Sequence, residues 1–528
     1  MAGRLTRRVE RLTIKRMATK KSRRLYIIGA GFAGRTLANE VRGKAIFGEV
    51  VAFLDDDREK IGQNVDGIPV LGPIRDVARL LRRKSADEAV IAMPSVSGEY
   101  LQNLYTILKK AGFERIRILP GISQIVDGEA HLIQTRSINP QDLLGRTPVA
   151  INLKESLAYL RGKRVLVTGA GGSIGGELCR QLLSGGVERL YLFGHGENSI
   201  YHIDRELRIL RDEGVGEKTT LVPVIGDLKD RHYMDYIIGR LKADAVFHTA
   251  AYKHVPLMEE NPVAAIENNL LGTDNLLNAA LKHGVKRFVL VSTDKAVEPV
   301  SVYGVSKYLC ERLVLDAARP DNGGAANFMV VRFGNVLGSR GSIVPLFQKQ
   351  IEKGGPVTIT HPDMKRWFMT IPEACSLVLK AGGVGENGAL YLLDMGEPVA
   401  ISDIAEQMIR FHGYEPEIDI KVETVGLRPG ERLGENLWAS HEKPVDTQYS
   451  RIKKIEYSAE RLLPFAPEAD IDALMKKLLP VCRFDDASPE SYRDADLLRA
   501  ILHEAIPTLP YRKAVKQQTG SIDTSAQS

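Results

Sequence analysis

The feature that most restricts the fold of this chain is a glycine-rich turn between a hydrophobic strand and a helix, in the segment Lys163–Gly175. The turn has the spacing Gly-x-x-Gly-x-x-Gly from Gly169, and a helix is expected over residues 176–184. Glycines at this spacing allow a tight turn, a close approach of the backbone to a diphosphate, and close packing of helix against strand. The segment therefore predicts a parallel α/β sheet with a dinucleotide site at this turn. The residues assigned to it are Gly169, Gly172, Ser173, Ile174 and Gly175.

A second glycine-rich turn, Gly29-x-Gly-x-x-Gly34, also follows a hydrophobic strand and precedes an expected helix. The next expected strand ends in Asp55, roughly 20 residues past the glycines, where a ribose-binding acid lies in a Rossmann unit. No acid–base cluster accompanies this turn, so a vestigial or regulatory nucleotide fold is as consistent with it as a working site. We therefore predict an α/β chain with two Rossmann-like parallel-sheet domains, the first over residues 25–148 and the second over residues 149–484.

The length and the net charge of the chain limit the classes of protein to which it can belong. The chain has 528 residues and a net charge of +6, much of it in a basic N-terminal arm over residues 1–24. The remainder is close to neutral, so we expect no nucleic-acid partner. The arm could make peripheral contact with an anionic membrane surface, but a solvated extension is the preferred interpretation. Residues 485–528 are interpreted as a charged and polar tail.

Cysteine spacing and hydropathy indicate the compartment. The four cysteines are scattered, with no C-x-x-C spacing, so we predict no metal site and a reducing environment. No run of 18 apolar residues and no signal peptide are present, so no transmembrane span is expected. These features predict a cytoplasmic location, with membrane association only through the basic arm.

The strand expected at residues 189–193 bears on the choice of cofactor. Gly194 occupies the position where an acid would select a ribose hydroxyl. His195 could instead face a 2′-phosphate, although Glu197 is near enough to bind a ribose hydroxyl. NADP is therefore favoured over NAD, and both remain open. The further residues assigned to the cofactor are His195, Asn198, Asp227, Leu228, Ala250, Ala251, Tyr303 and Lys307.

A cluster of reactive side chains follows another hydrophobic strand, in Ser292-Thr-Asp-Lys295, with Tyr303 and Lys307 just beyond it. Tyr303 and Lys307 are four residues apart and so share a helix face, where the ammonium can lower the pKa of the phenol towards neutrality. The alternative interpretation is an ordinary strand, turn and amphipathic helix. That interpretation gives little structural reason for an Asp-Lys pair beside a nucleotide-binding fold. The residues assigned to catalysis are Thr293, Asp294, Lys295, Tyr303 and Lys307.

Polar and basic segments outside the cofactor half are candidates for binding an anionic substrate. Arg366 and Arg428 can hold a diphosphate through charge-assisted hydrogen bonds, and a surface ion pair is the alternative for each. The residues assigned to the substrate are Lys253, Asn335, Arg366, Arg428 and Glu431.

Over most of residues 163–432 the chain resembles the nucleotide-sugar 4,6-dehydratases acting on UDP-N-acetylglucosamine, in the polysaccharide-biosynthesis branch of the extended short-chain dehydrogenases/reductases. The matching segments are Thr168-Gly-Ala-Gly-Gly-Ser-Ile-Gly175, Ala250-Ala-Tyr-Lys-His-Val-Pro-Leu-Met-Glu259, Ser292-Thr-Asp-Lys-Ala-Val297, Arg332-Phe-Gly-Asn-Val-Leu-Gly-Ser339, His361-Pro-Asp-Met-Lys-Arg-Trp-Phe-Met369 and Arg428-Pro-Gly-Glu431. Large members of the family carry membrane spans that are not found here, and many have Met where this chain has Tyr303.

The resemblance implies a redox-neutral cycle on a UDP-sugar, with a tightly bound and recycled NADP or NAD. Tyr303, activated by Lys307, would take the 4-hydroxyl proton, Lys295 the C5 proton, and Asp294 would protonate the departing 6-hydroxyl. A small C-terminal substrate subdomain and a homo-oligomer are also expected. Two alternatives remain open: a nucleotide-sugar epimerase that uses the same 4-keto intermediate, and a catalytically idle nucleotide- or sugar-binding regulator.

Overall fold

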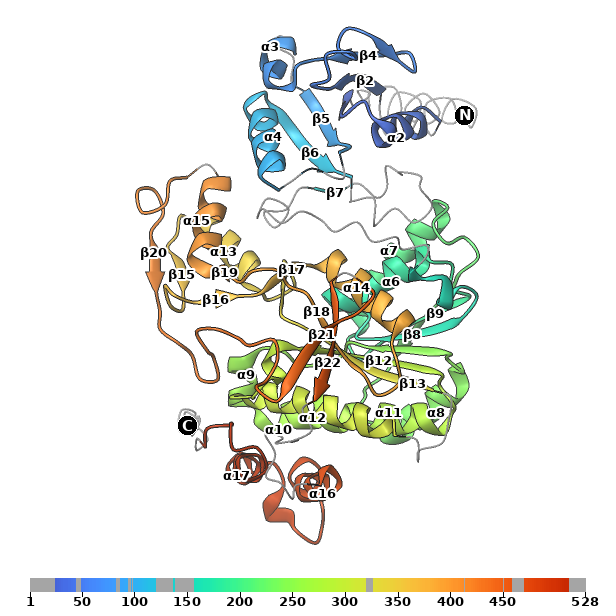
Figure 1. The fold of residues 1–528 in the computed structure, drawn as a ribbon, viewed down its shortest axis with the longest axis vertical. Helices are drawn as coiled ribbons and strands as arrows, with labels where there is room; N and C mark the ends of the chain where they lie inside the picture. The colour runs from blue at the N-terminus through green and yellow to red at the C-terminus, as the bar shows by residue number, and fades with distance from the viewer. Residues whose placement is uncertain are drawn as a thin grey trace, which may run out of the picture. The chain divides into compact units, whose positions relative to one another are not determined.

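The computed structural model describes residues 24–43, 49–81, 86–93, 96, 98–119, 136–137, 156–319, 326–412, 414–449, 451–457 and 470–511 (Figure 1). The chain divides into two compact units, Met1–Ala150 and Ile151–Ser528. The predicted basic arm, apart from Arg24, and the predicted tail beyond residue 511 lie outside the described residues.

The first unit is a mostly parallel sheet with the strand order β3-β4-β2-β1-β5-β6-β7. The strands from β4 to β6 in this order are parallel, and β3 and β7 add antiparallel edges. The strands are β1 (Arg24–Ile28), β2 (Glu49–Leu54), β3 (Asn64–Val65), β4 (Ile68–Leu71), β5 (Ala86–Ile91), β6 (Phe113–Ile118) and β7 (Arg136–Ser137). The helices are α2 (Phe32–Gly43), α3 (Val77–Leu80) and α4 (Gly98–Lys110).

Helical spacing of apolar residues explains how α2 packs on this sheet. Leu37, Ala38 and Val41 share one face of α2, and they join Ile27 and Phe53 in a buried core cluster. Strands covered on both faces are near-continuous hydrophobic runs, as β1 is here.

The second unit contains a nine-stranded sheet with the order β10-β9-β8-β11-β12-β13-β18-β22-β21. The strands from β10 to β18 in this order are parallel, whereas β22 and β21 are antiparallel. They are β8 (Arg164–Thr168), β9 (Arg189–Gly194), β10 (Thr220–Ile225), β11 (Ala245–His248), β12 (Arg287–Thr293), β13 (Asn327–Phe333), β18 (Leu390–Leu393), β21 (Glu442–Asp446) and β22 (Ile452–Tyr457). The prediction of two Rossmann-like parallel-sheet domains is confirmed.

Helices cover both faces of this second sheet (Figure 1). On one face lie α8 (Arg231–Leu241), α11 (Gly272–Lys282) and α12 (Val302–Ala317), and on the other α6 (Ser173–Ser184), α7 (Glu197–Asp212) and α14 (Ile371–Val384). Shorter helices α9 (Val255–Glu260) and α10 (Pro262–Ala265) and a π-helix, η6 (Ile266–Leu271), lead into α11.

A smaller lobe is built from segments beyond β13. It contains α13 (Ile343–Glu352), α15 (Ile401–Phe411) and three two-stranded pairs. The pairs are β14 (Asn335–Leu337) with β17 (Phe368–Thr370), β15 (Val357–Ile359) with β20 (Val422–Thr424), and β16 (Lys365–Arg366) with β19 (Val399–Ala400). This lobe lies above the carboxyl ends of the parallel strands in Figure 1, which is where open α/β sheets bind their ligands.

Two helices near the C-terminus, α16 (Ile471–Cys482) and α17 (Ala495–Ala505), pack against α10 and α12. Arg499 of α17 donates to Glu259 Oε2 at 3.1 Å, and Glu259 Oε1 accepts from the Val302 amide at 2.7 Å. Val302 is the first residue of α12, whose amide has no partner within the helix. The part of the predicted polar tail that the structure describes therefore includes a helix that supports the start of α12.

Membrane crossing was not expected from hydropathy. Among the described residues, no helix is both long and apolar enough to span a bilayer.

Candidate active site

The glycine turn between β8 and α6 packs too closely for any side chain. Gly169 has a φ of +68°, and a Cβ there would lie 2.9 Å from Ala250 Cα. A Cβ at Gly175 would lie 2.2 Å from the Gly169 carbonyl oxygen. The turn ends at Gly172, the N-cap of α6, where amides without intrahelical partners can bind an anion.

Two cavities meet at this turn. The first, of about 260 Å³, includes His195, Asp227, Leu228, Ala250 and Ala251 in its lining. The second, of about 770 Å³, reaches from the same turn to Thr293, Lys295, Tyr303 and Lys307. Gly169, Gly172 and Ala251 line both. An extended ligand with a diphosphate in its middle fits this arrangement, because the glycines and the N-terminus of α6 stand between the two spaces.

For three polar residues near the smaller cavity, the prediction of which side chains line it differs from the structure. Asn198 is exposed and is not among the described lining residues, whereas Ser199 lines the cavity and donates to the Gly196 carbonyl at 2.8 Å. Arg340 was not predicted, yet it lines both cavities and donates to the Gly171 carbonyl at 2.9 Å. Arg340 is 169 residues away from Gly171, so only tertiary packing brings a guanidinium to the turn.

The predicted catalytic residues lie around the larger cavity. Thr293 ends β12, and its hydroxyl donates to Asp294 Oδ1 at 2.8 Å. Lys295 Nζ donates to the same oxygen at 3.0 Å and to Asn335 Oδ1 at 3.1 Å. Asp294 is fully buried, and its Oδ2 has no hydrogen-bond partner among the described residues. Asp294 therefore lies behind Thr293 and Lys295, which face the cavity.

Tyr303 and Lys307 occupy the first turns of α12, with both side chains buried against the same cavity. Burial, followed by the charge of Asp294, raises the pKa of Tyr303. The expectation that Lys307 brings this pKa towards neutrality does not describe the structure, because Lys307 Nζ donates to the Val291 carbonyl at 2.9 Å. Burial lowers the pKa of Lys307 itself.

A buried histidine lies below the glycine turn. His248 Nδ1 is 2.7 Å from Thr168 Oγ1, and its Nε2 is 2.8 Å from Thr273 Oγ1. Burial and the nearby charge of Lys307 lower the pKa of His248 to about 3. The imidazole is therefore neutral at physiological pH and links two strands to α11.

The predicted substrate residues separate into two groups. Lys253, Asn335, Arg428 and Glu431 line the larger cavity. Arg428 is half exposed and pairs with Glu431 at 3.4 Å. Arg366 is buried, is not among the lining residues, and donates to main-chain carbonyls of residues 365, 432 and 433. Its guanidinium therefore holds the segment that carries Glu431.

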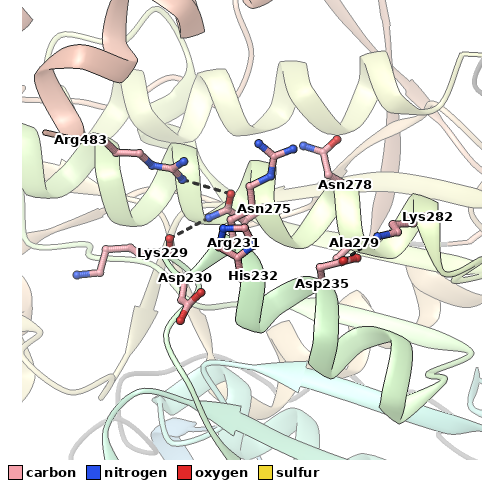
Figure 2. Close-up of a pocket in the computed structure, with 10 residues that line it drawn as sticks. All are labelled: Lys229, Asp230, Arg231, His232, Asp235, Asn275, Asn278, Ala279, Lys282 and Arg483. Atoms are coloured by element: carbon pink, nitrogen blue, oxygen red, sulfur yellow. Dashed lines mark hydrogen bonds and ion pairs between the residues drawn. The ribbon is translucent and has the colours of Figure 1, made fainter. Parts of the chain in front are cut away.

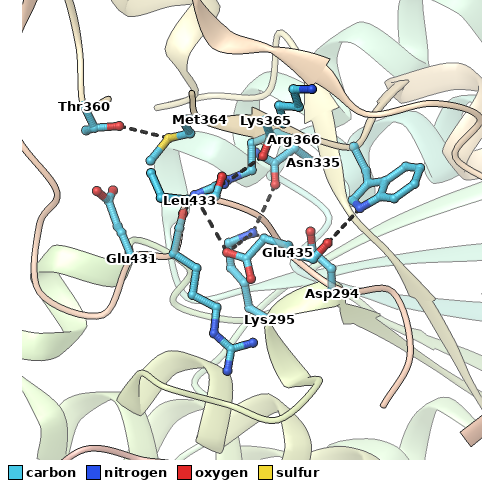
Figure 3. Close-up of polar contacts among 12 residues, drawn as sticks. Asp294, Lys295, Asn335, Thr360, Met364, Lys365, Arg366, Glu431, Leu433 and Glu435 are labelled. Carbon is cyan, nitrogen blue, oxygen red and sulfur yellow. Dashed lines mark hydrogen bonds and ion pairs between the residues drawn. The ribbon is translucent and has the colours of Figure 1, made fainter. Parts of the chain in front are cut away.

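Glu435, which was not predicted, lies beside the Asp294–Lys295 pair with only 6% of its side chain exposed (Figure 3). Its Oε1 is 3.8 Å from Lys295 Nζ and 3.9 Å from Arg366 Nη2. Its main-chain carbonyl accepts from Trp367 Nε1 at 2.8 Å, which fixes the segment against the residue that joins β16 to β17. Its position beside Lys295 arises from packing between distant segments, which no spacing in the sequence reports.

A third cavity, of about 600 Å³, lies between α8, α11 and Arg483 (Figure 2). Arg483 donates to Asn275 Oδ1 at 3.4 Å, and Asn275 donates to the Leu228 carbonyl at 2.8 Å. Lys282 pairs with Asp235 at 2.7 Å. Asn275 thus anchors the segment whose Leu228 side chain lines the smaller cavity of the candidate site.

Metal ligation has no support within the described part of the chain. It holds no group of three or more His, Cys, Asp or Glu side chains arranged to bind a metal ion. All four cysteines are free and buried.

Comparisons with known proteins identify related chains. Residues 165–457 match the model of a family described as polysaccharide biosynthesis protein, and residues 3–120 match one described as a CoA-binding domain. The capsular polysaccharide biosynthesis protein CapD of Staphylococcus aureus is 42% identical over 428 residues, which are 81% of this chain and 70% of that protein. A UDP-glucose 4-epimerase of Rickettsia canadensis is 34% identical over 288 residues, 53% of this chain and 79% of that protein.

The solved structures that resemble this chain include an X-ray structure of 30% identity. The X-ray structure of Pen from Bacillus thuringiensis aligns with a TM-score of 0.51 at 30% identity. The alignment covers 57% of this chain and 90% of that one.

Proposed function

This chain belongs to the polysaccharide biosynthesis protein family, and on that premise we propose that it is a nucleotide-sugar 4,6-dehydratase acting on UDP-N-acetylglucosamine. The product is a UDP-4-keto-6-deoxy sugar. The proposal is supported chiefly by one observation: Lys295, Tyr303 and Lys307 line the same cavity. Lys295 is also hydrogen-bonded to Asp294. That cavity continues into the glycine turn, so acid–base groups and a dinucleotide groove share one space.

The cofactor proposed for the groove is NADP or NAD. Gly169, Gly172 and the N-terminus of α6 would hold its diphosphate, and Asp227 would accept from the adenine amino group. Residue 194 is a glycine rather than an acid, and His195 lines the cavity beside it. The absence of a carboxylate at residue 194 leaves room for a 2′-phosphate. When bound, the dinucleotide would supply the hydride chemistry, which is removal of hydride from C4 and its return at C6, and its oxidised nicotinamide would carry a positive charge.

Tyr303 takes the proton of the sugar 4-hydroxyl in the proposed reaction. Its raised pKa keeps the phenol protonated at neutral pH until positive charge lies beside it. Lys307 lies four residues further along α12, where its ammonium donates to the Val291 carbonyl, and it lines the same cavity. Oxidation at C4 then acidifies the hydrogen at C5.

Lys295 and Asp294 carry out the elimination of water. Lys295 faces the cavity and takes the C5 proton in its neutral form. Asp294 is fully buried, so a proton from it would have to pass through the Thr293 hydroxyl, which would turn from donating to Asp294 Oδ1 at 2.8 Å to donating to the departing 6-hydroxyl. The proton released from the 4-hydroxyl balances the one that leaves in water.

The UDP group of the substrate would bind at the open end of the larger cavity. Arg428 lines this end with half of its side chain exposed, and it supplies a planar set of donors for a diphosphate. Lys253 lines the same cavity, and its ammonium is 3.4 Å from Ser339 Oγ.

A 4-epimerase is the second candidate, and the relative named as a UDP-glucose 4-epimerase favours it. Both reactions pass through a 4-keto sugar, but an epimerase needs no base at C5 and no acid for a 6-hydroxyl. The ion pair between buried Asp294 and Lys295, which faces the cavity, therefore supports dehydration.

The test is incubation of the purified protein with UDP-N-acetylglucosamine without added reductant. A dehydratase gives a product lighter by one water, with a keto sugar in its NMR spectrum. A product isomeric with the substrate identifies an epimerase, and tight binding without turnover identifies an idle binding protein.

A further inference from the structure

We propose that Arg340 binds the diphosphate of the dinucleotide and so helps to retain the cofactor in its groove. The inference rests on the dinucleotide site of the proposed function and adds to that site a cation from the smaller lobe. Arg340 lies in the loop between β14 and α13, whereas the glycine turn joins β8 to α6. The groove of the sheet is therefore completed by a residue from the lobe that lies above it.

Arg340 lies where the two cavities of the site meet. Six of the described lining residues are common to both cavities: Gly169, Gly172, Thr249, Ala251, Tyr252 and Arg340. Of these six, only Arg340 carries a charge at neutral pH. A dinucleotide that occupies both spaces has its diphosphate at this junction, because its two nucleosides lie on either side. The charged residue of the junction therefore lies beside the charged part of the ligand.

Two hydrogen bonds hold Arg340 against the glycine turn. Its guanidinium Nη1 donates to the Gly171 carbonyl at 2.9 Å, and its main-chain amide donates to the Ser173 hydroxyl at 3.0 Å. Ser173 is the first residue of α6. Because its hydroxyl oxygen accepts from Arg340, its own hydrogen remains available for an anion. The loop and the Arg340 side chain are thus both held beside the amides that can receive a diphosphate.

The Arg340 guanidinium keeps donors that can bind an anion. Within the described part of the chain, the Gly171 carbonyl is its only hydrogen-bond partner, and no carboxylate forms an ion pair with it. A guanidinium has five N–H donors in a planar fork that matches two phosphate oxygens. By contrast, carbonyls occupy donors of Arg366, and Arg428 pairs with Glu431. Of these three arginines, Arg340 can bind an anion without losing an ion pair.

The loop around Arg340 is held by other groups of the site. Gly341 has a φ of +71°, and a Cβ there would lie 2.4 Å from His254 Cε1, so the loop turns closely against the segment that carries Lys253. On the other side of Arg340, Ser339 Oγ lies 3.4 Å from Lys253 Nζ. These contacts place the loop before a ligand binds, so binding costs less conformational entropy.

Retention of the dinucleotide matters for the proposed reaction. The hydride leaves the sugar and returns to it on the same dinucleotide, so release between these two steps would leave the sugar oxidised. The dinucleotide can leave only after its contact with Arg340 has broken. Contacts of this kind act mainly on the rate of dissociation. Arg340 is therefore expected to slow the release of the cofactor.

The test measures the affinity of the nucleotide-free protein for NADP and for NAD by calorimetry. In Arg340→Gln we expect both affinities to fall by about 10–100-fold, the range of a hydrogen bond to a charged group. Release of NADPH, followed by its fluorescence on mixing with excess NADP, should become faster by a similar factor. Arg410→Gln, which replaces an exposed arginine of α15, is the matched control and should follow the wild type.

Two further measurements separate a direct contact from support of the turn. The affinity of the wild type should fall more steeply with added salt than that of Arg340→Gln, because the variant has lost one charge contact. Equal salt dependence would assign Arg340 to holding the turn. Arg340→Lys keeps the charge without the planar fork and should recover part of the affinity. It also provides the comparison if circular dichroism shows that the glutamine variant is not folded.

Other outcomes would overturn the inference. A loss confined to NADP would assign Arg340 to the 2′-phosphate, and a loss confined to UDP would assign it to the substrate. Affinities equal to those of the wild type would remove Arg340 from cofactor binding and leave the proposed function intact. A wild type that binds neither dinucleotide would refute the cofactor of the proposed function, and the role of Arg340 with it.

Discussion

The two units of the chain contain the same strand–glycine turn–helix arrangement but differ in what surrounds it. A Cβ at Gly34 would lie 1.9 Å from the Gly29 carbonyl oxygen, and one at Gly175 would lie 2.2 Å from that of Gly169. The packing requirement of the last glycine is thus the same in both units. Glycine spacing specifies how helix and strand meet and says little about chemistry.

The two units differ in the residues at the ends of their strands. In the first unit, Asp55 Oδ2 accepts from the Ala30 amide in the turn at 2.7 Å. In the second unit, the corresponding strand β9 ends at Gly194, which places no charge there. On the other side of the turn, Ile28 pairs with Ile91 in the first unit, whereas Thr168 pairs with His248 in the second. Polar groups at strand ends, rather than the turn, distinguish the candidate active site.

The strongest test of this contrast replaces one strand-end acid in each unit. Asp294→Asn should slow dehydration by about 10²–10⁴-fold, because the acid for the leaving group is lost. Asp55→Asn should leave the rate within about twofold. Steady-state kinetics on both purified variants measures the effect. A near-normal rate in Asp294→Asn would exclude Asp294 from the mechanism.

The matched glycines provide the next test. Gly175→Ala forces a methyl group against the Gly169 carbonyl, and overpacking of this kind costs about 1–3 kcal/mol. We expect the affinity for NADP or NAD to fall by about 10–100-fold, measured by calorimetry. Gly34→Ala makes the same clash in the first unit and should leave this affinity unchanged. Equal losses in both variants would mean that the first unit contributes to dinucleotide binding.

His248 makes the stability of the second unit depend on pH. Its pKa is about 3 in the folded chain and near 6.5 when unfolded, so the unfolded state binds the proton between these values. Its contribution to stability is complete above about pH 6.5 and is lost as pH falls. From pH 7 to pH 5 we expect the free energy of unfolding to drop by about 2 kcal/mol.

Urea unfolding of the wild type and His248→Asn at both pH values measures this drop. The variant should be less stable at pH 7 and should show a smaller dependence on pH. The same dependence in both proteins would show that His248 is not the group that titrates.

The smallest effect is expected from removing the first unit. A fragment beginning at residue 151 keeps the glycine turn, the acid–base residues and Arg428. Its rate should stay within about tenfold of that of the whole chain, with lower stability from any surface that becomes exposed. Circular dichroism should first establish that the fragment is folded. A folded but inactive fragment would show that the first unit contributes directly to the reaction.

Local features of the chain were predictable, and features created by packing were not. The glycine turns, Thr293 to Lys295 and the helix with Tyr303 each follow from short-range spacing. Arg340 and Glu435 reach the site from distant segments, and no periodicity in the sequence reports that. Arg366 was predicted as a diphosphate ligand from its charge, which does not reveal that carbonyls already occupy its donors. The pKa of Tyr303 was misjudged because burial outweighs an ammonium that lies elsewhere.

The contact between α17 and the start of α12 has a consequence for biosynthesis. Arg499 follows Glu259 by 240 residues, yet through Glu259 it supports the first amide of the helix that carries Tyr303. A ribosome releases the amino-terminal parts of a chain first, and these fold before the rest exists. The glycine turn can therefore form early, whereas the start of the helix that carries Tyr303 gains this support only after α17 has been synthesised. A nascent chain that ends before α17 would therefore contain the glycine turn while the first amide of α12 lacks the support that Arg499 gives through Glu259.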